Sequence, residues 1–520
     1  MKLNKEILRL ALPSILANIT VPLVGMVDMA IAGHLPGGSS AAFIGGITIG
    51  TMIFDLLYWN FGFLRVGTGG LTAQEFGHLR GLCPLLSPAA FSPSTFLLSQ
   101  KPGYGRAPDG ALLPYRAEIE AIGNILRRAL RIALISGVAM LVLQWVIVQA
   151  AFLLVDCSPE VRQLASRYFY IRIWAAPATL SLFAFKGWFI GLQDTVRPMT
   201  ADLLVNGINI AASILLALGV GGTGGLLPGV PTLIPALGFP GIALGTVLAQ
   251  WSGFAYCLLA ARRRYGYSIA LQSMLYPSVP VNPDTGTETE ATETENPSPG
   301  SFFQLNRNLF LRSLGMIAVY IGFTVISARY GDLMLAVSAI LMKLLMFFSY
   351  FSDGFAYAGE ALTGRFIGEG SREGVKATVR GTFLWGLGVS ALFMLAYGVG
   401  GVPILQLMTD DATVVEAGRE FLPWLLLMPL IGCPAFIWDG IFIGATASRD
   451  LRNSTLLSAV GFFVWWWVDS WLGNAFNPGM EGLTPEMAIH CLMRAYFVHL
   501  AIRALYLTLR YRHDILKPLC

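Results

Sequence analysis

Long apolar stretches separated by short polar segments make up most of this chain. A helix that crosses a membrane needs about 20 mostly apolar residues, and twelve stretches satisfy this requirement. Six lie in the first half, near residues 7–33, 42–77, 128–155, 162–191, 198–219 and 236–261. Six more lie near residues 308–328, 333–367, 377–408, 414–446, 452–473 and 487–509. The pattern therefore predicts an all-α integral membrane protein with twelve transmembrane helices.

One polar tract separates the two sets of apolar stretches. Residues 277–301 are rich in Pro, Thr and Glu and have no apolar periodicity. Such a segment cannot bury enough apolar surface to fold, so we expect it to be disordered. The chain is thus predicted to consist of an N-terminal six-helix lobe (1–265), a cytoplasmic linker (266–305) and a C-terminal six-helix lobe (306–520).

Short motifs recur at equivalent places in the two halves. Leu71–Gly77 (LTAQEFG) is similar to Leu362–Gly368 (LTGRFIG) at an offset of 291 residues, and Lys186–Gly191 (KGWFIG) is similar to Asp439–Gly444 (DGIFIG) at an offset of 253. The repeat predicts two pseudo-symmetric six-helix bundles. Because the offsets differ by 38 residues, the first half is expected to carry a cytoplasmic insertion near residues 78–120.

Composition supports the membrane assignment. Hydrophobic residues make up 55% of the chain and charged residues only 13%, against about 25% charged in an ordinary soluble domain. The net charge of +4 is too small and too dispersed to indicate nucleic-acid binding. Basic residues concentrate in every second connecting segment, which predicts that both termini are cytoplasmic. Examples are Lys2, Lys5, Arg9, Arg128, Arg131, Arg262–Arg264, Arg372, Lys376, Arg452 and Arg512.

No pattern in the chain indicates catalysis or a cofactor. The six cysteines lie far apart, without the spacing of a metal site or of a disulfide framework. No phosphate-binding GxxxxGK[ST] loop occurs, which argues against ATP drive within this chain. A nucleophile–base arrangement is absent as well. We therefore expect a non-enzymatic membrane protein without a cofactor.

Asp28 is an ionisable residue within the first apolar stretch. A charged group at the bilayer centre costs about 2.5–3.5 kcal/mol, so such residues are candidates for function. Removal from water disfavours the carboxylate, whereas a nearby cation favours it. A proton, a metal cation and a cationic substrate can therefore compete for Asp28, as an antiporter requires. The alternative is a structural salt bridge, for which Arg172 is a plausible partner.

Three polar residues follow one another on the fifth apolar stretch. Asn209 and Ser213 share a helix face, and Asn206 lies close to that face. Amide groups can coordinate a desolvated cation or bind a substrate. They can equally hydrogen-bond neighbouring helices together, and the sequence alone slightly favours this second interpretation.

Further charges lie in the second half. Lys343, Asp353 and Glu360 lie on the eighth stretch, and Asp439 lies on the tenth, where the repeat aligns it with Lys186. Asp353 and Glu360 are two turns apart on one face. A Lys186–Asp439 pair between the lobes is a candidate gate. The alternative, that both side chains extend to the membrane interface, is favoured.

At these residues the chain resembles the multidrug and toxic compound extrusion (MATE) family, and within it the DinF-like branch. The resemblance is carried by LPSILANITVPLVGMVDMAIAGHL, FGFLRVGTGGLTAQEFG, IWAAPATLSLFAFKGWFIGLQDT, FFSYFSDGFAYAGEALTGRFIG and WDGIFIGAT. It covers essentially all twelve stretches. It implies a multi-pass protein of a bacterial inner membrane that exports cationic or amphipathic compounds in exchange for H⁺ or Na⁺.

The resemblance also implies roles for single residues. Asp28 matches the acidic residue of the family's first helix, Pro13 matches the proline at which that helix bends, and Asn209 matches an asparagine of the fifth helix. Four residues later the family often has an aspartate, whereas this chain has Ser213. The chain thus lacks one carboxylate of that site, which leaves more of the ion coupling to Asp28.

Three functions remain open at this stage. The leading hypothesis is a cation-coupled multidrug exporter, since competition for a membrane carboxylate is the simplest chemistry for an antiporter. It would act on cationic or amphipathic small molecules as a monomer among membrane lipids, without nucleic acid. A flippase for lipid-linked oligosaccharides would need a cationic cavity, for which Arg65, Arg172, Lys186 and Lys343 are available. A passive channel or membrane scaffold would need no titrating carboxylate.

Overall fold

The computed structural model describes residues 2–33, 35, 40–82, 116–154, 157–221, 232–265, 299–408, 412–476 and 483–519. These residues form helices and short connections, with no β-strand among them. Twelve segments within them are long and apolar enough to cross a membrane. The prediction of an all-α membrane protein with twelve transmembrane helices is therefore confirmed.

The chain divides into two compact units. The first unit comprises Leu16–Phe302, and the second comprises Met1–Ile15 together with Phe303–Cys520. The long helix α1 (Lys2–Gly33) therefore belongs to both units. The sequence analysis placed residues 1–15 in the first lobe, whereas in the structure they pack with the second.

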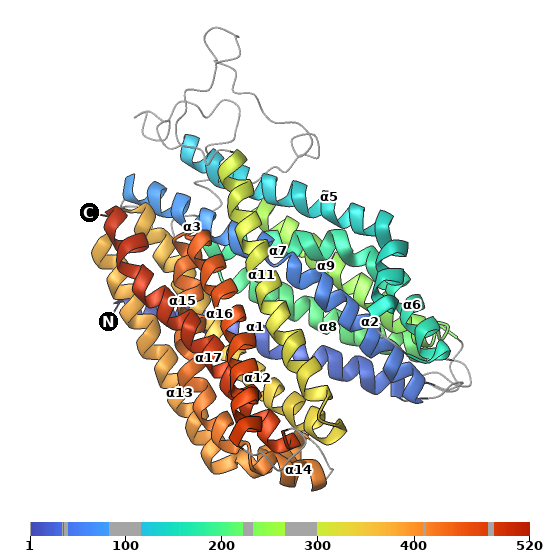
Figure 1. Ribbon diagram of the computed structural model, residues 1–520. Helices are drawn as coiled ribbons and strands as arrows, with labels where there is room; N and C mark the ends of the chain where they lie inside the picture. Colours follow the sequence, from blue (N-terminus) through green and yellow to red (C-terminus); the bar gives the residue numbers. More distant parts are fainter. Residues whose placement is uncertain are drawn as a thin grey trace. The chain divides into compact units, whose positions relative to one another are not determined.

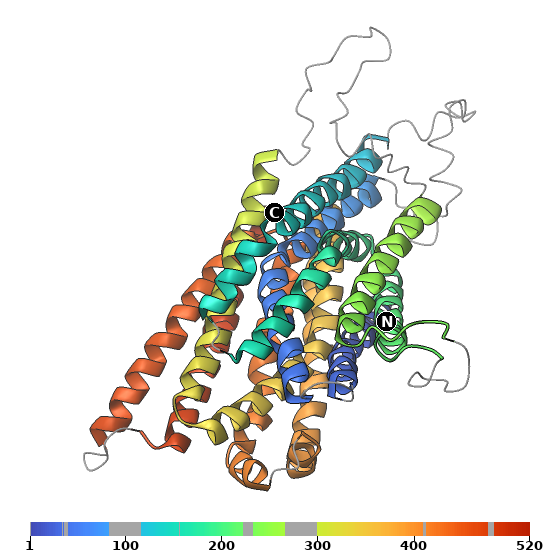
Figure 2. The ribbon, with the colours of Figure 1, turned by 90° about the vertical axis from the view of Figure 1, so that its right-hand side faces the viewer.

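The helices of the first unit, coloured blue to green in Figures 1 and 2, pack along one another. In chain order they are α2 (Ser40–Asn60), α3 (Phe63–Leu82), α5 (Arg116–Leu154), α6 (Pro159–Arg172), a 3₁₀ turn (Ile173–Ala175), α7 (Ala176–Gly191), α8 (Val196–Leu218) and α9 (Phe239–Tyr265). Two membrane spans are each built from two helices, α2 with α3 and α6 with α7.

The ends of the predicted insertion, residues 78–120, are helical, because α3 continues to Leu82 and α5 starts at Arg116. Residues 83–115 lie outside the described residues.

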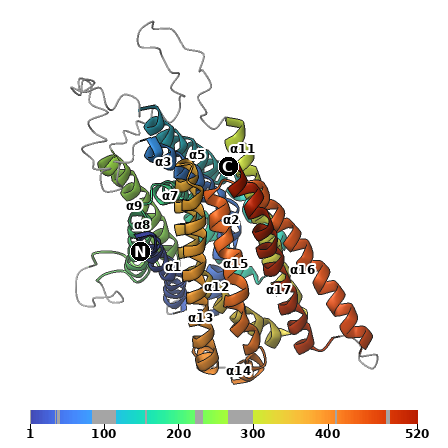
Figure 3. The same cartoon turned by 90° about the vertical axis from the view of Figure 1, so that its left-hand side faces the viewer.

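The second unit is a bundle of long helices coloured yellow to red (Figures 1 and 3). It contains α11 (Pro299–Ala328), α12 (Asp332–Gly368), α13 (Arg372–Met408), α14 (Ala412–Arg419), α15 (Leu422–Gly444), α16 (Ser448–Phe476) and α17 (Pro485–Tyr511), followed by a π-helical turn (Arg512–Leu516) and a 3₁₀ turn (Lys517–Leu519). Since α11 starts at Pro299, the linker ends earlier than the predicted residue 305. Residues 266–298 of the linker lie outside the described residues.

The internal repeat is visible in how helices cross within each unit. In the first unit Gly187 of α7 lies so close to α3 that a Cβ atom there would overlap the carbonyl of Arg65. In the second unit Gly440 of α15 has the same relation to the carbonyl of Ala356 on α12. Gly187 and Gly440 are related by the 253-residue offset, and Arg65 and Ala356 by the 291-residue offset. The two crossings are therefore copies of one packing arrangement.

The turns that follow these crossings are also repeated. Gln193 and Thr446, again 253 residues apart, adopt left-handed backbone conformations with φ of 60° and 53°. The amide of Asp194 donates to the carbonyl of Phe189 at 2.9 Å, and the amide of Ala447 donates to that of Phe442 at 3.0 Å. Such bonds satisfy the last carbonyls of a helix and allow the chain to reverse.

The start of α1 packs closely against helices of the second unit, to which it belongs. Gly354 of α12 leaves room for Ala11 and Ile15, and Gly381 of α13 leaves room for Ile7. These contacts bury apolar side chains of α1 among helices whose sequence lies more than 330 residues away.

Candidate ion-coupling and substrate site

Asp28 is buried in the first unit, with only 6% of its surface exposed. Its neighbours are the hydroxyl of Ser213, within hydrogen-bonding reach, and the guanidinium of Arg172, which acts on it through its charge. Its Oδ1 atom has no hydrogen-bond partner. Within the described part of the chain Asp28 forms no ion pair, so the alternative of a direct salt bridge with Arg172 is not realised. A buried, incompletely satisfied carboxylate is costly, which is typical of a site built for a ligand.

Helix α8 brings the predicted polar residues to the same region. Asn209 is 3% exposed and donates from Nδ2 to Thr246 Oγ1 of α9 at 2.9 Å, while its Oδ1 atom has no hydrogen-bond partner. Ser213 is fully buried and donates to the carbonyl of Ile242 at 3.4 Å. The arrangement leaves one amide oxygen and one carboxylate oxygen available, and oxygen atoms are the ligands that a desolvated Na⁺ or a proton would need.

Asn206 lies on the side of α8 that meets α1. Its Nδ2 atom donates to Thr20 Oγ1 at 2.6 Å, and Thr20 in turn donates to the carbonyl of Ala17 at 2.7 Å. This contact joins α1 to α8 within the first unit. Asn206 therefore hydrogen-bonds two helices together, which was one of the two roles expected for these amides. Asn209 also hydrogen-bonds to a neighbouring helix, but its Oδ1 atom has no partner.

Close packing of α8 against α9 holds this region in place. Gly245 of α9 leaves no room for a Cβ atom next to the backbone and hydroxyl of Ser213, and Gly241 has the same relation to the backbone of Leu216. Small residues of this kind allow helix backbones to approach closely in membranes. Thr246, which the sequence analysis did not consider, lies on this crossing.

The corresponding positions of the second unit carry a different set of side chains. The 253-residue offset relates Asn209, Ser213 and Thr246 to Phe462, Trp466 and His499. His499 is 3% exposed and its Nδ1 atom has no hydrogen-bond partner. The oxygen-rich arrangement around Asp28 is thus a property of the first unit.

Arg172 is fixed at the end of α6. Its Nη1 atom donates to the hydroxyl of Tyr168 at 3.0 Å and to Thr51 Oγ1 at 3.3 Å. The guanidinium carbon lies 4.8 Å from the ring centre of Phe54 and 5.5 Å from that of Tyr168. Hydroxyl groups and aromatic faces therefore surround this charge.

The two residues of the candidate gate each have an ion-pair partner within their own unit. Lys186 pairs with Asp202 of α8, and Asp439 pairs with both Arg312 of α11 and Arg503 of α17. A Lys186–Asp439 gate would require both residues to exchange these partners, and it remains a hypothesis.

Arg312 and Arg503 were missed in the sequence analysis. Both lie well inside apolar stretches, so a count of charges within the seventh and twelfth spans would have found them. What the sequence could not show is that both converge on Asp439.

The predicted residues of the eighth apolar stretch lie on α12, which belongs to the second unit. On this helix Lys343 is exposed, Asp353 is half-buried and Glu360 is fully buried. Pro13 is half-buried on α1, where it removes one backbone donor from the helix. Around it α1 continues as an unbroken helix.

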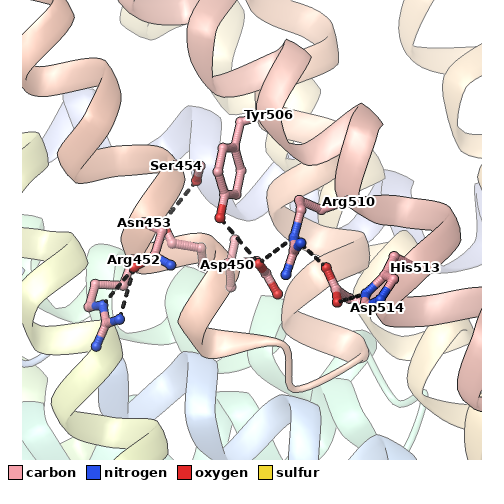
Figure 4. A network of polar contacts seen from close by, with 9 residues as sticks. Asp450, Arg452, Asn453, Ser454, Tyr506, Arg510, His513 and Asp514 are labelled. Atoms are coloured by element: carbon pink, nitrogen blue, oxygen red, sulfur yellow. Dashed lines mark hydrogen bonds and ion pairs between the residues drawn. The ribbon is translucent and has the colours of Figure 1, made fainter.

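A second polar network connects the start of α16 to the end of α17 (Figure 4). Asp450 accepts from Arg510 Nε at 3.1 Å and from the hydroxyl of Tyr506 at 3.4 Å. Arg510 also pairs with Asp514, which contacts His513 at 2.7 Å. In Figure 4 these side chains form a continuous chain of contacts. We assign the network a structural role, because it fastens two neighbouring helix ends.

Comparison with known proteins agrees with this architecture. The MatE family profile matches residues 117–215 and 309–465. DNA damage-inducible protein F of Escherichia coli (strain K12) is 30% identical over 518 residues, which cover 98% of this chain and 92% of that protein. The probable multidrug resistance protein NorM of Pasteurella multocida is 20% identical over 99% of this chain and 95% of its own length.

Solved structures extend the comparison to the fold. A MOP superfamily transporter from Pyrococcus furiosus superimposes with a TM-score of 0.71 at 15% identity, covering 98% of this chain and 96% of that one. At this identity the likeness concerns the fold alone. Twelve apolar helices in two related bundles thus define a multi-pass membrane transporter rather than an enzyme. The chain belongs to the MATE family and is a DinF-like member of it.

Proposed function

We propose that this protein is a secondary active antiporter that exports cationic or amphipathic small molecules in exchange for H⁺ or Na⁺ by alternating access. In this proposal it resides in a bacterial inner membrane, acts as a monomer among lipids and has both termini in the cytoplasm. Family membership supports transport of small molecules. The coupling and the substrate class rest on the arrangement around Asp28.

The observation that carries the proposal is the unsatisfied Oδ1 atom of the buried Asp28. A carboxylate fixed only for structure would be expected to have all its lone pairs satisfied. Asp28 can instead alternate between a proton or Na⁺ and the cationic group of a substrate. Since one carboxylate cannot neutralise both at once, binding of either cation favours release of the other.

The amides of α8 supply the remaining polar groups in this proposal. Asn209 Oδ1 is a second oxygen without a partner, and the hydroxyl of Ser213, one turn further along α8, acts on Asp28. Na⁺ binds preferentially to such oxygen atoms, whereas a proton needs only the carboxylate. Asn206, Asn209 and Ser213 are accordingly proposed to tune which coupling ion is used.

Efflux from proteoliposomes tests the proposal. Liposomes that contain the purified protein in their membrane are loaded with a cationic dye. Efflux of the dye is then driven first by a pH gradient and then, separately, by a Na⁺ gradient. Asp28→Asn keeps the size of the side chain but removes its charge, so we expect gradient-driven efflux to fall to the level of protein-free liposomes. The gradient that drives efflux in the unmodified protein identifies the coupling ion.

The matched control is Glu160→Gln, which removes an exposed carboxylate from the first turn of α6. This variant should transport at the unmodified rate. Undiminished, gradient-dependent efflux by Asp28→Asn would remove Asp28 from the mechanism. Efflux that needs no gradient would instead support a passive channel.

A flippase for an anionic, lipid-linked substrate is the second candidate. It is favoured by Arg312 and Arg503, two buried cations in the second unit. The Pyrococcus furiosus transporter is described as having a binding pocket of reverse polarity that suggests a different function. Here both arginines already share Asp439, which makes this candidate secondary. Gradient-independent translocation of a fluorescent pyrophosphate-linked lipid that survives Asp28→Asn would establish it.

A further inference from the structure

Arg172 lies at a break inside a membrane span. Helix α6 ends at this residue, a 3₁₀ turn follows at Ile173–Ala175, and α7 begins next to Pro177. Proline has no backbone N–H, so the helical ladder is interrupted there. The indole of Trp251 on α9 donates to the carbonyl of Trp174, within the 3₁₀ turn, at 3.1 Å. A capped interruption of this kind fixes the position of the residue before it.

The contacts of Arg172 hold its charge without neutralising it. Its hydrogen bonds go to the hydroxyls of Tyr168 and Thr51, and its flat faces lie against the rings of Phe54 and Tyr168. In the described ranges no carboxylate forms an ion pair with it. Hydroxyls and rings attract a cation without cancelling its charge, and the carboxylates of Asp55 and Asp28 offset that charge through space rather than by direct contact.

That charge acts on the coupling carboxylate. The charged or titratable groups around Arg172 are the hydroxyls of Tyr58 and Tyr168 and the carboxylates of Asp55 and Asp28. Those that act on Asp28 are Arg172 itself and the hydroxyl of Ser213. Away from water, charges interact over longer distances than at a surface. A cation that arrives at Asp28 is therefore repelled by Arg172 while it is attracted by the carboxylate.

We propose that Arg172 is a resident positive charge that weakens cation binding at Asp28, so that both the exported cation and the coupling ion can leave. This inference rests on the proposed antiport function and assigns Arg172 to release and charge selectivity. A transport site must bind strongly enough to be filled and weakly enough to be emptied. A lone buried carboxylate would hold a cation tightly. The fixed guanidinium offsets this attraction, and it also penalises a second positive charge on the substrate.

A pair of ions of matched shape tests the inference. Tetraphenylphosphonium is a cation and tetraphenylborate is an anion of nearly the same size. Binding of each to purified protein is measured by calorimetry for the unmodified protein and for Arg172→Gln. We expect the cation to bind about ten-fold more tightly to the variant, the scale on which one nearby charge shifts a neighbouring equilibrium. The anion should bind equally or more weakly.

Transport kinetics distinguish this role of Arg172 from a merely structural one, which would not lower KM and kcat together. In proteoliposomes Arg172→Gln should lower both KM and kcat for tetraphenylphosphonium, because tighter binding slows release. Arg172→Lys keeps the charge but not the stacking on the rings, and because the charge is what weakens cation binding, its cation affinity should stay closer to that of the unmodified protein than that of Arg172→Gln. If Arg172→Gln does not fold, Arg172→Met, which keeps the length of the side chain, takes its place.

The matched control is Arg162→Gln on the same helix. Arg162 also stacks on a phenylalanine, at 4.9 Å from the Phe152 ring centre, but it does not act on Asp28. This variant should leave the affinities of both ions unchanged. An unchanged or weaker cation affinity in Arg172→Gln, or no cation binding in either protein, overturns the inference. That result is independent of Asp28→Asn efflux, which tests the antiport function itself.

Discussion

Asp439 neutralises two buried guanidinium groups at once. The side chains of Asp439 and Arg503 are 10% and 2% exposed, and that of Arg312 is 12% exposed. Arg503 Nε also donates to Asp439 Oδ1 at 3.3 Å. Such a cluster adds little net stability compared with apolar residues, but removing one member leaves the others without compensation. The single carboxylate therefore links α15 to both α11 and α17 through ion pairs.

Asp439→Asn should lower the stability of the second unit by about 3–5 kcal/mol, the usual consequence of breaking a buried ion pair from one side. Thermal unfolding of the purified protein in detergent measures this. Glu373→Gln, which breaks the exposed pair with Lys376, is the matched control and should cause no resolvable change. An unfolding temperature of Asp439→Asn equal to that of the control would contradict the prediction.

At the scale of elements, the crossings of α3 with α7 and of α12 with α15 are the features that the two units share most closely. Each depends on a glycine, Gly187 or Gly440, that brings a backbone carbonyl of the partner helix into direct contact. Gly191 and Gly444 repeat the arrangement one turn later. A backbone carbonyl cannot change rotamer to relieve an overlap as a side chain can. A Cβ atom at any of these glycines would therefore overlap the partner helix.

Gly440→Ala should therefore destabilise the protein, by about 1–3 kcal/mol on the scale of overpacked cores. Gly388 of α13 is a matched control in the same unit, because nothing lies within 4 Å of the Cβ atom that it would carry. There alanine should be neutral or stabilising, since it favours helix over glycine. Both variants are compared by thermal unfolding in detergent, and equal stability of the two would refute this account of the crossing.

At the scale of the whole molecule, α1 joins the two units through one continuous helix. Its first residues are tied to the second unit by the ion pair between Glu6 and Arg365 Nη1, at 2.6 Å, and by packing against Gly354 and Gly381. Its later residues carry Asp28 and belong to the first unit. Any movement of one unit relative to the other must therefore be taken up within α1 or at its contacts. Pro13, near the division, is the place where its backbone bonding is weakest.

If residues 2–15 move with the second unit throughout transport, fixing them to it should be harmless. Asn4 Oδ1 lies 3.6 Å from the Cβ atom that Gly381 would carry. Because Ile7 Cδ1 would lie 2.5 Å from that Cβ atom, the variant Asn4→Cys with Gly381→Cys also carries Ile7→Val, which removes Cδ1. In a background without the native cysteines it should form a disulfide on oxidation and retain efflux. The reduced form of the same variant is the control. Loss of efflux on oxidation that reductant restores would show that α1 detaches from the second unit during the cycle.

The sequence by itself determined the membrane class, the twelve spans and the repeat, because spanning a bilayer imposes length and apolarity on each segment separately. It also singled out Asp28, since a carboxylate within an apolar run is conspicuous. The tertiary structure decided which charges meet: Asp439 with two arginines, Lys186 with Asp202, and Arg172 with hydroxyls and rings. It also decided that the start of α1 packs with the second unit. Most of these outcomes depend on contacts between different helices, which no local pattern specifies.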